Sequence, residues 1–191
     1  MGSSGAEGAA RARCVVLLGF MAAGKSAVGA LLAERLGWAH VDLDREIERR
    51  EGRRVADIFA ADGEARFRAL EAEVTAEVGR RTEIVLSPGG GWVTRPELRD
   101  LLHPLTLVVR LLVSPEEAVR RAASAPGERP LLAGADPLAA ARRLLAEREP
   151  LYAAAAGLSI ETEGRTPAEV AEEIAGVVRG GLLGGNPRML A

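Results

Sequence analysis

Residues 19–28, GFMAAGKSAV, decide the fold because they connect a buried strand to a helix through a glycine-containing turn. Gly19, Gly24, Lys25 and Ser26 match the pattern G-x4-G-K-[ST], in which backbone N–H groups turn inward around a phosphate. The apolar run CVVLL precedes the stretch and the helical pattern SAVGALLAERLG follows it, as the motif requires. This setting predicts a nucleoside triphosphate site rather than a chance glycine turn.

Lys25 is the single lysine among the 25 lysine and arginine residues of the chain. An ammonium group is a compact point charge, whereas a guanidinium is a wide planar fork, so the exception points to a specific role. We expect Lys25 to reach the β- and γ-phosphates and the Ser26 hydroxyl to be available to Mg²⁺. Alanines occupy three positions where such loops often carry glycine or a second hydroxyl, and their N–H donors survive if these residues adopt negative φ: Ala22, Ala23 and Ala27.

The composition is that of a globular protein, with 48% apolar and 27% charged residues over 191 positions. A net charge of −2 gives no bulk attraction to nucleic acid or to an anionic membrane. No apolar run approaches the roughly 18 residues that a membrane helix needs. The one cysteine, Cys14, cannot form an internal disulfide. We therefore expect a cytoplasmic protein without nucleic-acid or membrane partners.

Short apolar runs alternate with helical segments, which is typical of βαβ units. Strands are expected at residues 13–18, 39–44, 83–87, 105–113 and 158–162. Helices are expected at residues 26–37, 45–81, 95–102, 114–123, 138–156 and 166–178, with a break near residue 62 and a kink or break at Pro150. Capping boxes are expected at Ser114 with Glu117 and at Thr166 with Glu169. The pattern predicts an α/β fold, a five-stranded parallel sheet with helices on both faces, over residues 12–180, with flexible segments at 1–11 and 181–191.

Acids and glycines follow the second and third expected strands. Asp42 and Asp44 end the second strand, where a period of two would point both carboxylates to the same side. One could hold Mg²⁺ through water and the other could take a proton from an acceptor hydroxyl; a helix cap and a solvated acid are an equal alternative. Gly89, Gly90 and Gly91 permit close approach of a ligand or form a flexible turn.

Three arginines stand where helical faces do not explain them: Arg68, Arg129 in the polar segment ERPLL, and Arg148. Guanidinium groups bind carboxylate and phosphate in a two-point fashion, but most arginines of a chain are surface charges. None of the three identifies the phosphate acceptor alone. A GTPase is disfavoured because an N-K-x-D element would need a second lysine.

Taken together, these segments resemble the shikimate kinase family of small P-loop kinases. The shared segments lie in the family's order between about residues 14 and 178: GFMAAGKSAVG, VDLDREIERREGRRVADIF, GEARFRALEAE, LSPGGGWV, ERPLL and EREPLYAAAA. The resemblance implies a P-loop kinase three-layer sandwich with a lid over about residues 122–137. It implies transfer of the γ-phosphate of ATP to the 3-hydroxyl of shikimate, with Mg²⁺ as cofactor, ATP and shikimate as the small-molecule partners, and a monomer.

On the nucleotide side, the resemblance implies that Lys25 contacts the phosphates, that Ser26 binds Mg²⁺ and that Asp42 supports the metal through water. Arg121 and Arg165 would flank the adenine and the ribose, with Arg120 as the alternative to Arg121. The remaining loop residues that would contact the nucleotide are Ala22, Ala23, Gly24 and Ala27.

On the acceptor side, the resemblance implies that Asp44 holds the shikimate hydroxyls and acts as the general base. Arg68 and Arg148 would clamp the carboxylate. Arg129, on the lid, would stabilise the transferring phosphate, so that the expected catalytic residues are Lys25, Asp44 and Arg129. The glycine run would line the acceptor pocket: Gly89, Gly90 and Gly91.

Trp92 stands where the family usually has a small residue, and it would either narrow the acceptor pocket or pack beside the sheet. Two other functions stay open. The chain could be another small-molecule P-loop kinase, such as a gluconate kinase. It could also be a catalytically silent nucleotide-binding module, which the joint presence of Lys25, Ser26, Asp44 and Arg129 disfavours.

Overall fold

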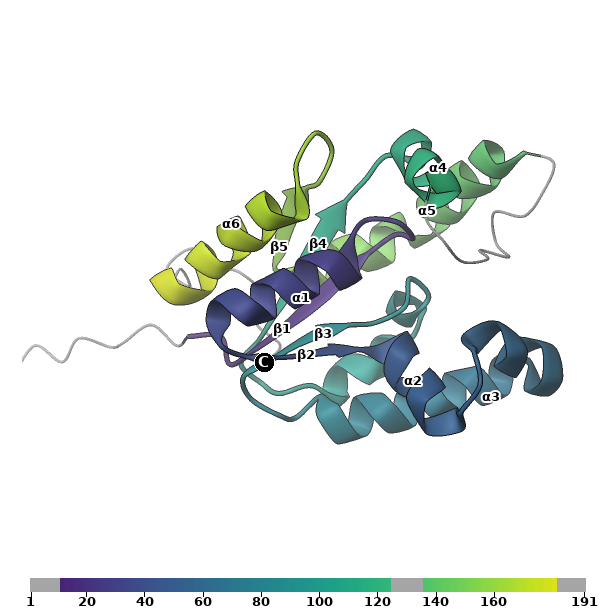
Figure 1. Cartoon of the computed structure of the whole chain (residues 1–191), viewed down its shortest axis with the longest axis horizontal. Coiled ribbons are helices and arrows are strands. Elements are labelled where there is room, and N and C mark those ends of the chain that lie inside the picture. Colours follow the sequence, from purple (N-terminus) through teal and green to yellow (C-terminus); the bar gives the residue numbers. More distant parts are fainter. Residues whose placement is uncertain (1–10, 125–135, 182–191) are drawn as a thin grey trace, which may run out of the picture.

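Five parallel strands form the middle layer of the part of the chain that the structure describes, in the order β2-β3-β1-β4-β5 (Figure 1). They are β1 (Cys14–Gly19), β2 (Ala39–Asp42), β3 (Ile84–Ser87), β4 (Thr106–Leu112) and β5 (Leu158–Glu161). The computed structural model describes residues 11–124 and 136–181. β1 and β3 are buried throughout, as strands covered on both faces should be. The predicted parallel sheet is confirmed.

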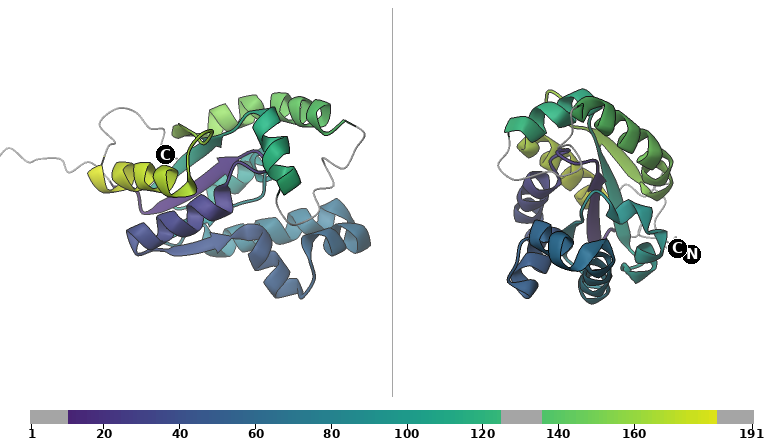
Figure 2. Two further views of the ribbon diagram at one scale, coloured as in Figure 1. Left: turned by 45° about the horizontal axis from the view of Figure 1, so that its top comes forward. Right: turned by 90° about the vertical axis from the view of Figure 1, so that its right-hand side faces the viewer.

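Helices cover both faces of this sheet, as the end-on view of Figure 2 shows. α1 (Lys25–Leu36) and α6 (Pro167–Gly180) pack against each other on one face. α2 (Leu43–Glu51), α3 (Val55–Val78) and the C-terminal half of α5 (Pro137–Ala155) lie on the other. α4 (Pro115–Ser124) packs against α5. Two 3-10 helices, η1 (Trp92–Thr94) and η2 (Pro96–Leu101), follow β3.

The alternation of β1 side chains divides the core in two. Val15 and Leu17 point to the core under α1 and α6, whereas Val16 and Leu18 point to the core under α3 and α5. All four side chains are at most 1% exposed, so the central strand is held from both sides. This anchoring fixes the loop that follows β1.

Several local predictions were wrong. The second strand ends at Asp42 instead of residue 44, because Asp42 is the N-cap of α2 and its Oδ1 accepts a hydrogen bond from the Arg45 N–H at 3.2 Å. Residues 45–81 are divided between two helices, since α2 ends at Glu51 and its C-cap Gly52 has φ 64°. α3 bends at Gly63, with φ 79°, where a break was predicted. Residues 96–101 form a 3-10 helix, and of the kink or break predicted at Pro150 the break is absent, since α5 continues through this residue.

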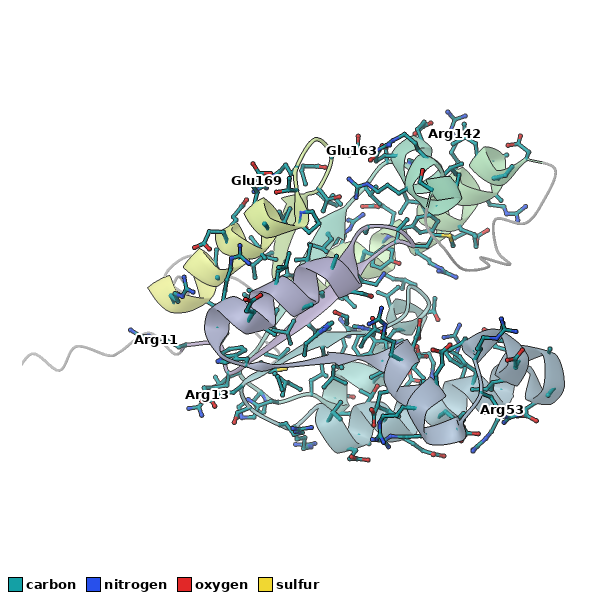
Figure 3. All side chains as sticks on the ribbon, in the orientation of Figure 1. Arg11, Arg13, Arg53, Arg142, Glu163 and Glu169 are labelled. Carbon is teal, nitrogen blue, oxygen red and sulfur yellow. The ribbon has the colours of Figure 1, made fainter. Side chains whose placement is uncertain are left out.

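One predicted capping box is confirmed and the other is only half formed. Thr166 and Glu169 make both reciprocal hydrogen bonds at the start of α6. At α4 the Ser114 hydroxyl accepts from the Glu117 N–H, but the Ser114 N–H donates to Glu163, which is labelled in Figure 3. The Glu117 carboxylate is instead taken by two arginines of its own helix: Arg120 and Arg121.

A close contact at Gly29 sets the position of α1. A Cβ at Gly29 would lie 2.5 Å from His40 Nε2 and 2.6 Å from Ser87 Oγ, so only glycine lets the helix approach β2 and β3 this closely. His40 and Ser87 are hydrogen-bonded at 3.0 Å, and the Ser87 hydroxyl also donates to the Lys25 carbonyl at 3.2 Å. The first turn of α1 is thereby tied to the end of β3.

Parts of the sequence interpretation lie outside the described residues. These are Arg129, most of the expected lid at 122–137, and nearly all of the two expected flexible segments at 1–11 and 181–191. Within residues 11–124 and 136–181, no helix is long and apolar enough to cross a membrane.

Candidate active site

The phosphate loop leaves the C-terminal end of β1 and enters α1 at the centre of the sheet. Gly19 has φ 154°, and a Cβ there would lie 2.7 Å from the Leu111 carbonyl oxygen, so the position requires glycine. Gly24 is the N-cap of α1 at φ 96° and gives the first turn no side-chain hydrogen bond. The positive end of the helix dipole therefore faces the loop, which favours an anion there.

Ala22 corrects one expectation about this loop. Its φ is 59°, in the left-handed region, so it does not meet the condition of negative φ under which the three alanines would keep their donors. Ala23 and Ala27 are not among the non-glycine residues with positive φ. Alternation between right- and left-handed residues is what forms a backbone anion nest. An alanine at this left-handed position therefore keeps the donors in place, at a cost of about 1–2 kcal/mol in backbone strain.

Lys25 lies across the mouth of the loop. Its Nζ donates to the carbonyl oxygens of Gly19 at 2.9 Å and Phe20 at 3.2 Å. These contacts hold the ammonium beside the cavity that the loop shares with the ends of β2 and β3. The arrangement places one positive charge beside the backbone of the loop.

Ser26 and Asp42 meet beside the loop. The Ser26 hydroxyl donates to Asp42 Oδ2 at 2.5 Å, and the other oxygen of Asp42 caps α2. Hydroxyl and carboxylate oxygens are the ligands that Mg²⁺ prefers, usually with only one or two carboxylates and the phosphates of the substrate. No group of three or more metal-ligating side chains occurs among the described residues, so a magnesium ion here would depend on this pair and on nucleotide oxygens. The two residues fit that role.

Asp44 lies in the first turn of α2 rather than on β2. The alternation of side chains along a strand therefore does not determine where its carboxylate points. It nevertheless lines the same cavity as Asp42, Lys25 and Ser26. Its Oδ1 is fully enclosed and has no hydrogen-bond partner among the described residues, and a Cβ on Gly89 would lie 3.0 Å from this oxygen. Burial, reinforced by the charges of Asp42 and Glu71, raises the pKa of Asp44 from 3.8 to about 6.

Two cavities flank the phosphate loop. One, of about 440 Å³, lies between the loop, α4 and the turn from β5 to α6. The other, of about 420 Å³, lies between the loop, the end of β2 and the glycine turn after β3. Three residues line both: Ala22, Gly24 and Arg121. A molecule in one cavity and a second molecule in the other would therefore meet at the loop.

Arg121 and Arg165 both line the first cavity. Arg121 is held by four contacts: its Nε donates to Glu117 at 2.7 Å, its Nη1 to the Thr162 hydroxyl at 3.1 Å and to the Ala22 carbonyl at 3.5 Å, and its Nη2 to the Thr162 carbonyl at 2.9 Å. Arg120 also lines the cavity, but its side chain is 70% exposed. The structure thus favours Arg121 over Arg120 as the arginine beside the loop.

Arg68 and Arg148 reach the glycine turn from two different helices. Arg68 lies against Gly91, where a Cβ would be 2.6 Å from its Nη2, and Arg148 Nη1 donates to the Gly90 carbonyl at 3.2 Å. Neither guanidinium lines the cavity that holds Asp44. Arg68 pairs with Glu64 at 3.0 Å and Glu71 at 2.9 Å. An acceptor carboxylate would therefore have to draw Arg68 away from partners it already has.

Glu71 is a residue that the sequence interpretation missed. Its side chain is completely buried, its Oε1 has no hydrogen-bond partner within the described ranges, and burial raises its pKa despite the charge of Arg68. The available signal was the helical spacing of three between Arg68 and Glu71. Trp92 belongs to the core, since it is 1% exposed and its Nε1 donates to the Thr75 hydroxyl at 3.2 Å.

A phosphate loop between β1 and α1, with two cavities that meet at it and an acid in the second, defines a P-loop kinase of the small-molecule class. Comparison with known families narrows this class: the family model "Shikimate kinase" matches residues 21–179, and the chain belongs to the shikimate kinase family.

Individual relatives agree with this assignment. A shikimate kinase of Symbiobacterium thermophilum is 48% identical over 161 residues, which is 84% of this chain and 92% of that one. The solved structure of Acinetobacter baumannii shikimate kinase in complex with shikimate superposes with a TM-score of 0.81 at 35% identity, covering 90% of this chain and 96% of that one. A gluconokinase of Sinorhizobium meliloti, at 18% identity and a TM-score of 0.57 over 88% of this chain and 92% of that one, shares the fold alone.

Proposed function

We propose that this chain transfers the γ-phosphate of ATP to the 3-hydroxyl of shikimate, giving shikimate 3-phosphate and ADP. The observation that carries the proposal is Asp44. Its carboxylate has one enclosed oxygen without a partner among the described residues, and it lines the same cavity as Lys25 and Ser26 of the phosphate loop. A buried acid beside a phosphate site has an evident use when a hydroxyl must be oriented and deprotonated.

The acceptor hydroxyl would donate its hydrogen bond to Asp44. With a pKa near 6, the carboxylate is ionised at neutral pH and is a better proton acceptor than an ordinary aspartate. The proton leaves the hydroxyl as the oxygen attacks the γ-phosphorus, and the bond from that phosphorus to the β,γ-bridging oxygen breaks. Gly89, whose missing side chain leaves room beside Asp44, would let the ring of shikimate approach.

The donor side would be held by the phosphate loop. Nucleotide phosphates would take the place of the carbonyl oxygens that now hold Lys25, and Arg121 would border the base from the neighbouring cavity with Arg165. Ser26 and Asp42 would hold Mg²⁺, which when bound neutralises charge on the β- and γ-phosphates. Arg129 lies outside the described residues and keeps its proposed role at the transferring phosphate.

The carboxylate of shikimate would bind Arg68 and Arg148 beside the glycine turn. Arg68 would exchange Glu64, an exposed partner at the helix surface, for the ligand and would retain Glu71, whose side chain is fully buried. Exposed ion pairs contribute little free energy, so this exchange is inexpensive. Arg148 already points its Nη1 at the same turn.

The alternative acceptor, gluconate, has a carboxylate and several hydroxyls too. It is disfavoured because the gluconokinase comparison extends to the fold alone, whereas the shikimate kinase relatives match over most of both chains. A catalytically silent module is disfavoured because the loop, Ser26, Asp42 and Asp44 are assembled in one cavity.

The test is ADP release in a coupled assay with ATP, Mg²⁺ and shikimate, with gluconate in place of shikimate as the control. Proton and phosphorus NMR of the product identifies the hydroxyl that carries the phosphate. Shikimate-dependent release with no response to gluconate is expected. ADP release that does not depend on shikimate would refute the proposal.

Two substitutions separate the two substrate sites. Arg68→Ala should raise the KM for shikimate at least tenfold and leave that for ATP within twofold, because Arg68 lies against the glycine turn and lines neither cavity beside the phosphate loop. Arg165→Met should do the reverse, because Arg165 lines the cavity next to α6 and does not line the one that holds Asp44. Equal effects on both KM values would show that the two cavities are wrongly assigned.

We also infer a cytoplasmic monomer. The buried thiol of Cys14, whose pKa burial raises to about 11, is unreactive and forms no disulfide with another cysteine of this chain. Light scattering should give a mass near 20.1 kDa. A mass twice that value would contradict the monomer.

A further inference from the structure

Arg110 is a buried charge that the chemistry described so far does not use. It lies on β4 and is only 8% exposed. Its Nη1 and Nη2 donate to the two carboxylate oxygens of Glu149 at 2.7 and 2.5 Å, and its guanidinium lies 5.3 Å from the centre of the Tyr152 ring. A guanidinium that is both paired at two points and stacked on an aromatic ring has a fixed orientation. Arg110 therefore ties the sheet to one particular turn of α5.

That turn contains a proline. Pro150 has no N–H, so it cannot donate the helical hydrogen bond to the carbonyl of Ala146. Arg148 and Glu149 immediately precede it. A helix weakened at this point depends on contacts with other elements to keep its side chains in place. The ion pair with Arg110 is one such contact.

A second contact comes from Tyr152, which is 1% exposed. Its hydroxyl donates to the Gly90 carbonyl oxygen at 2.9 Å, the same atom that accepts from Arg148 Nη1 at 3.2 Å. The glycine turn and the arginine are thus held by one carbonyl with two donors from α5. Arg110, stacked on the Tyr152 ring, supports the tyrosine from the sheet side.

We propose that Arg110, Glu149 and Tyr152 form a positioning unit that fixes Arg148 and the Gly90 carbonyl in the geometry that receives the carboxylate of the phosphate acceptor. The proposal rests on the proposed function, because that function gives Arg148 its ligand. None of the three touches the cavities beside the phosphate loop. They act through Arg148 and are positioning residues.

The test compares Arg110→Met, Glu149→Gln and Tyr152→Phe with the wild type in steady-state kinetics. Each should raise the KM for shikimate about five- to tenfold, the effect of losing one well-ordered hydrogen bond or its support, while kcat and the KM for ATP stay within twofold. Calorimetric titration of each protein with shikimate alone should show the same rise in Kd. Arg110→Lys should recover part of the loss, because it keeps the charge but not the two-point geometry.

The matched control is Arg142→Met. Arg142 lies on α5, as Glu149 does, and like Arg110 it pairs with a glutamate of another element (Glu116 on α4, at 2.5 Å). It is labelled at the outer surface in Figure 3. Its side chain is 61% exposed. This variant should leave the KM for shikimate within twofold of the wild type.

The outcomes separate the two proposals. A wild-type enzyme that does not phosphorylate shikimate would refute the proposed function and this inference with it. An active wild type with unchanged shikimate KM in the variants, or with parallel rises in both KM values, would overturn the positioning unit alone. A lower melting temperature with both KM values unchanged would do the same, since it indicates a purely structural role. If Arg110→Met does not fold, the proposal is decided by Tyr152→Phe and Glu149→Gln, because these two variants keep the shape and volume of the native side chains.

Discussion

Replacing Asp44 with asparagine should stabilise the protein while it inactivates the enzyme. In the folded state the pKa of Asp44 is raised from 3.8 to about 6, chiefly by burial. Between these two values the unfolded chain binds fewer protons than the native state, so the free energy of unfolding falls as pH rises through this range. The full penalty is present above pH 6 and disappears below about pH 4.

The magnitude follows from the same shift. About two pKa units at about 1.4 kcal/mol each give a penalty of at most about 3 kcal/mol at pH 8 and about half of that at pH 5. Asp44→Asn removes the ionisable group and should therefore raise the free energy of unfolding by about these amounts. Urea titrations at both pH values, with EDTA present to remove divalent cations, measure the difference.

Asp57→Asn is the control. Hydrogen bonds from Arg54 lower the pKa of Asp57, so its removal should give no gain at pH 8. In the activity assay, Asp44→Asn should lower kcat at least about a hundredfold, the usual contribution of a general base. In the wild type, kcat/KM for shikimate should fall about tenfold per pH unit below pH 6. A variant that is no more stable than wild type at pH 8, or equally stabilised at both pH values, would refute the reasoning.

Three further predictions concern the frame of the site. Ala22→Gly should raise the free energy of unfolding by up to about 1 kcal/mol in urea titrations, because the left-handed strain at φ 59° exceeds the added entropy of glycine in the unfolded chain; a destabilised variant would contradict this. Trp92→Phe should lower the free energy of unfolding by about 1–3 kcal/mol, because it leaves the Thr75 hydroxyl without its buried donor, and should leave the shikimate KM unchanged. A change in that KM of more than twofold would instead place Trp92 in the acceptor site. Gly29→Ala should both lower the melting temperature and raise the KM for ATP, because the added Cβ would displace α1 from His40 and Ser87. A lower melting temperature with an unchanged KM for ATP would contradict this, since it would show that the helix shift does not reach the loop.

The features that could be predicted from the sequence are those with a local cause. The phosphate loop lies between β1 and α1 because its glycines, its lysine and the apolar run before it are contiguous. The parallel sheet follows from alternating strands and helices. Strand order does not follow from either: β2 pairs with β3, so it is not the neighbour of β1.

The rest depended on contacts between distant residues. Asp44 lines the expected cavity, but it does so as a first-turn helical residue after the Asp42 cap, which alternation along a strand could not indicate. The left-handed φ of Ala22 comes from the closed loop and not from alanine's own preference. Arg110 and Glu149 are 39 positions apart, and nothing local marks either as a partner.

The position of Lys25 has a practical consequence for the chemistry of the intact protein. The chain has one side-chain amine, and it lies over the phosphate loop, held by the carbonyl oxygens of Gly19 and Phe20. Apart from the terminal amino group, an amine-selective acylating reagent therefore has a single target. The rate at which Lys25 is modified, followed by intact mass, therefore reports whether the loop is occupied. It needs no turnover and can be measured in every variant described above except Arg110→Lys, which adds a second amine.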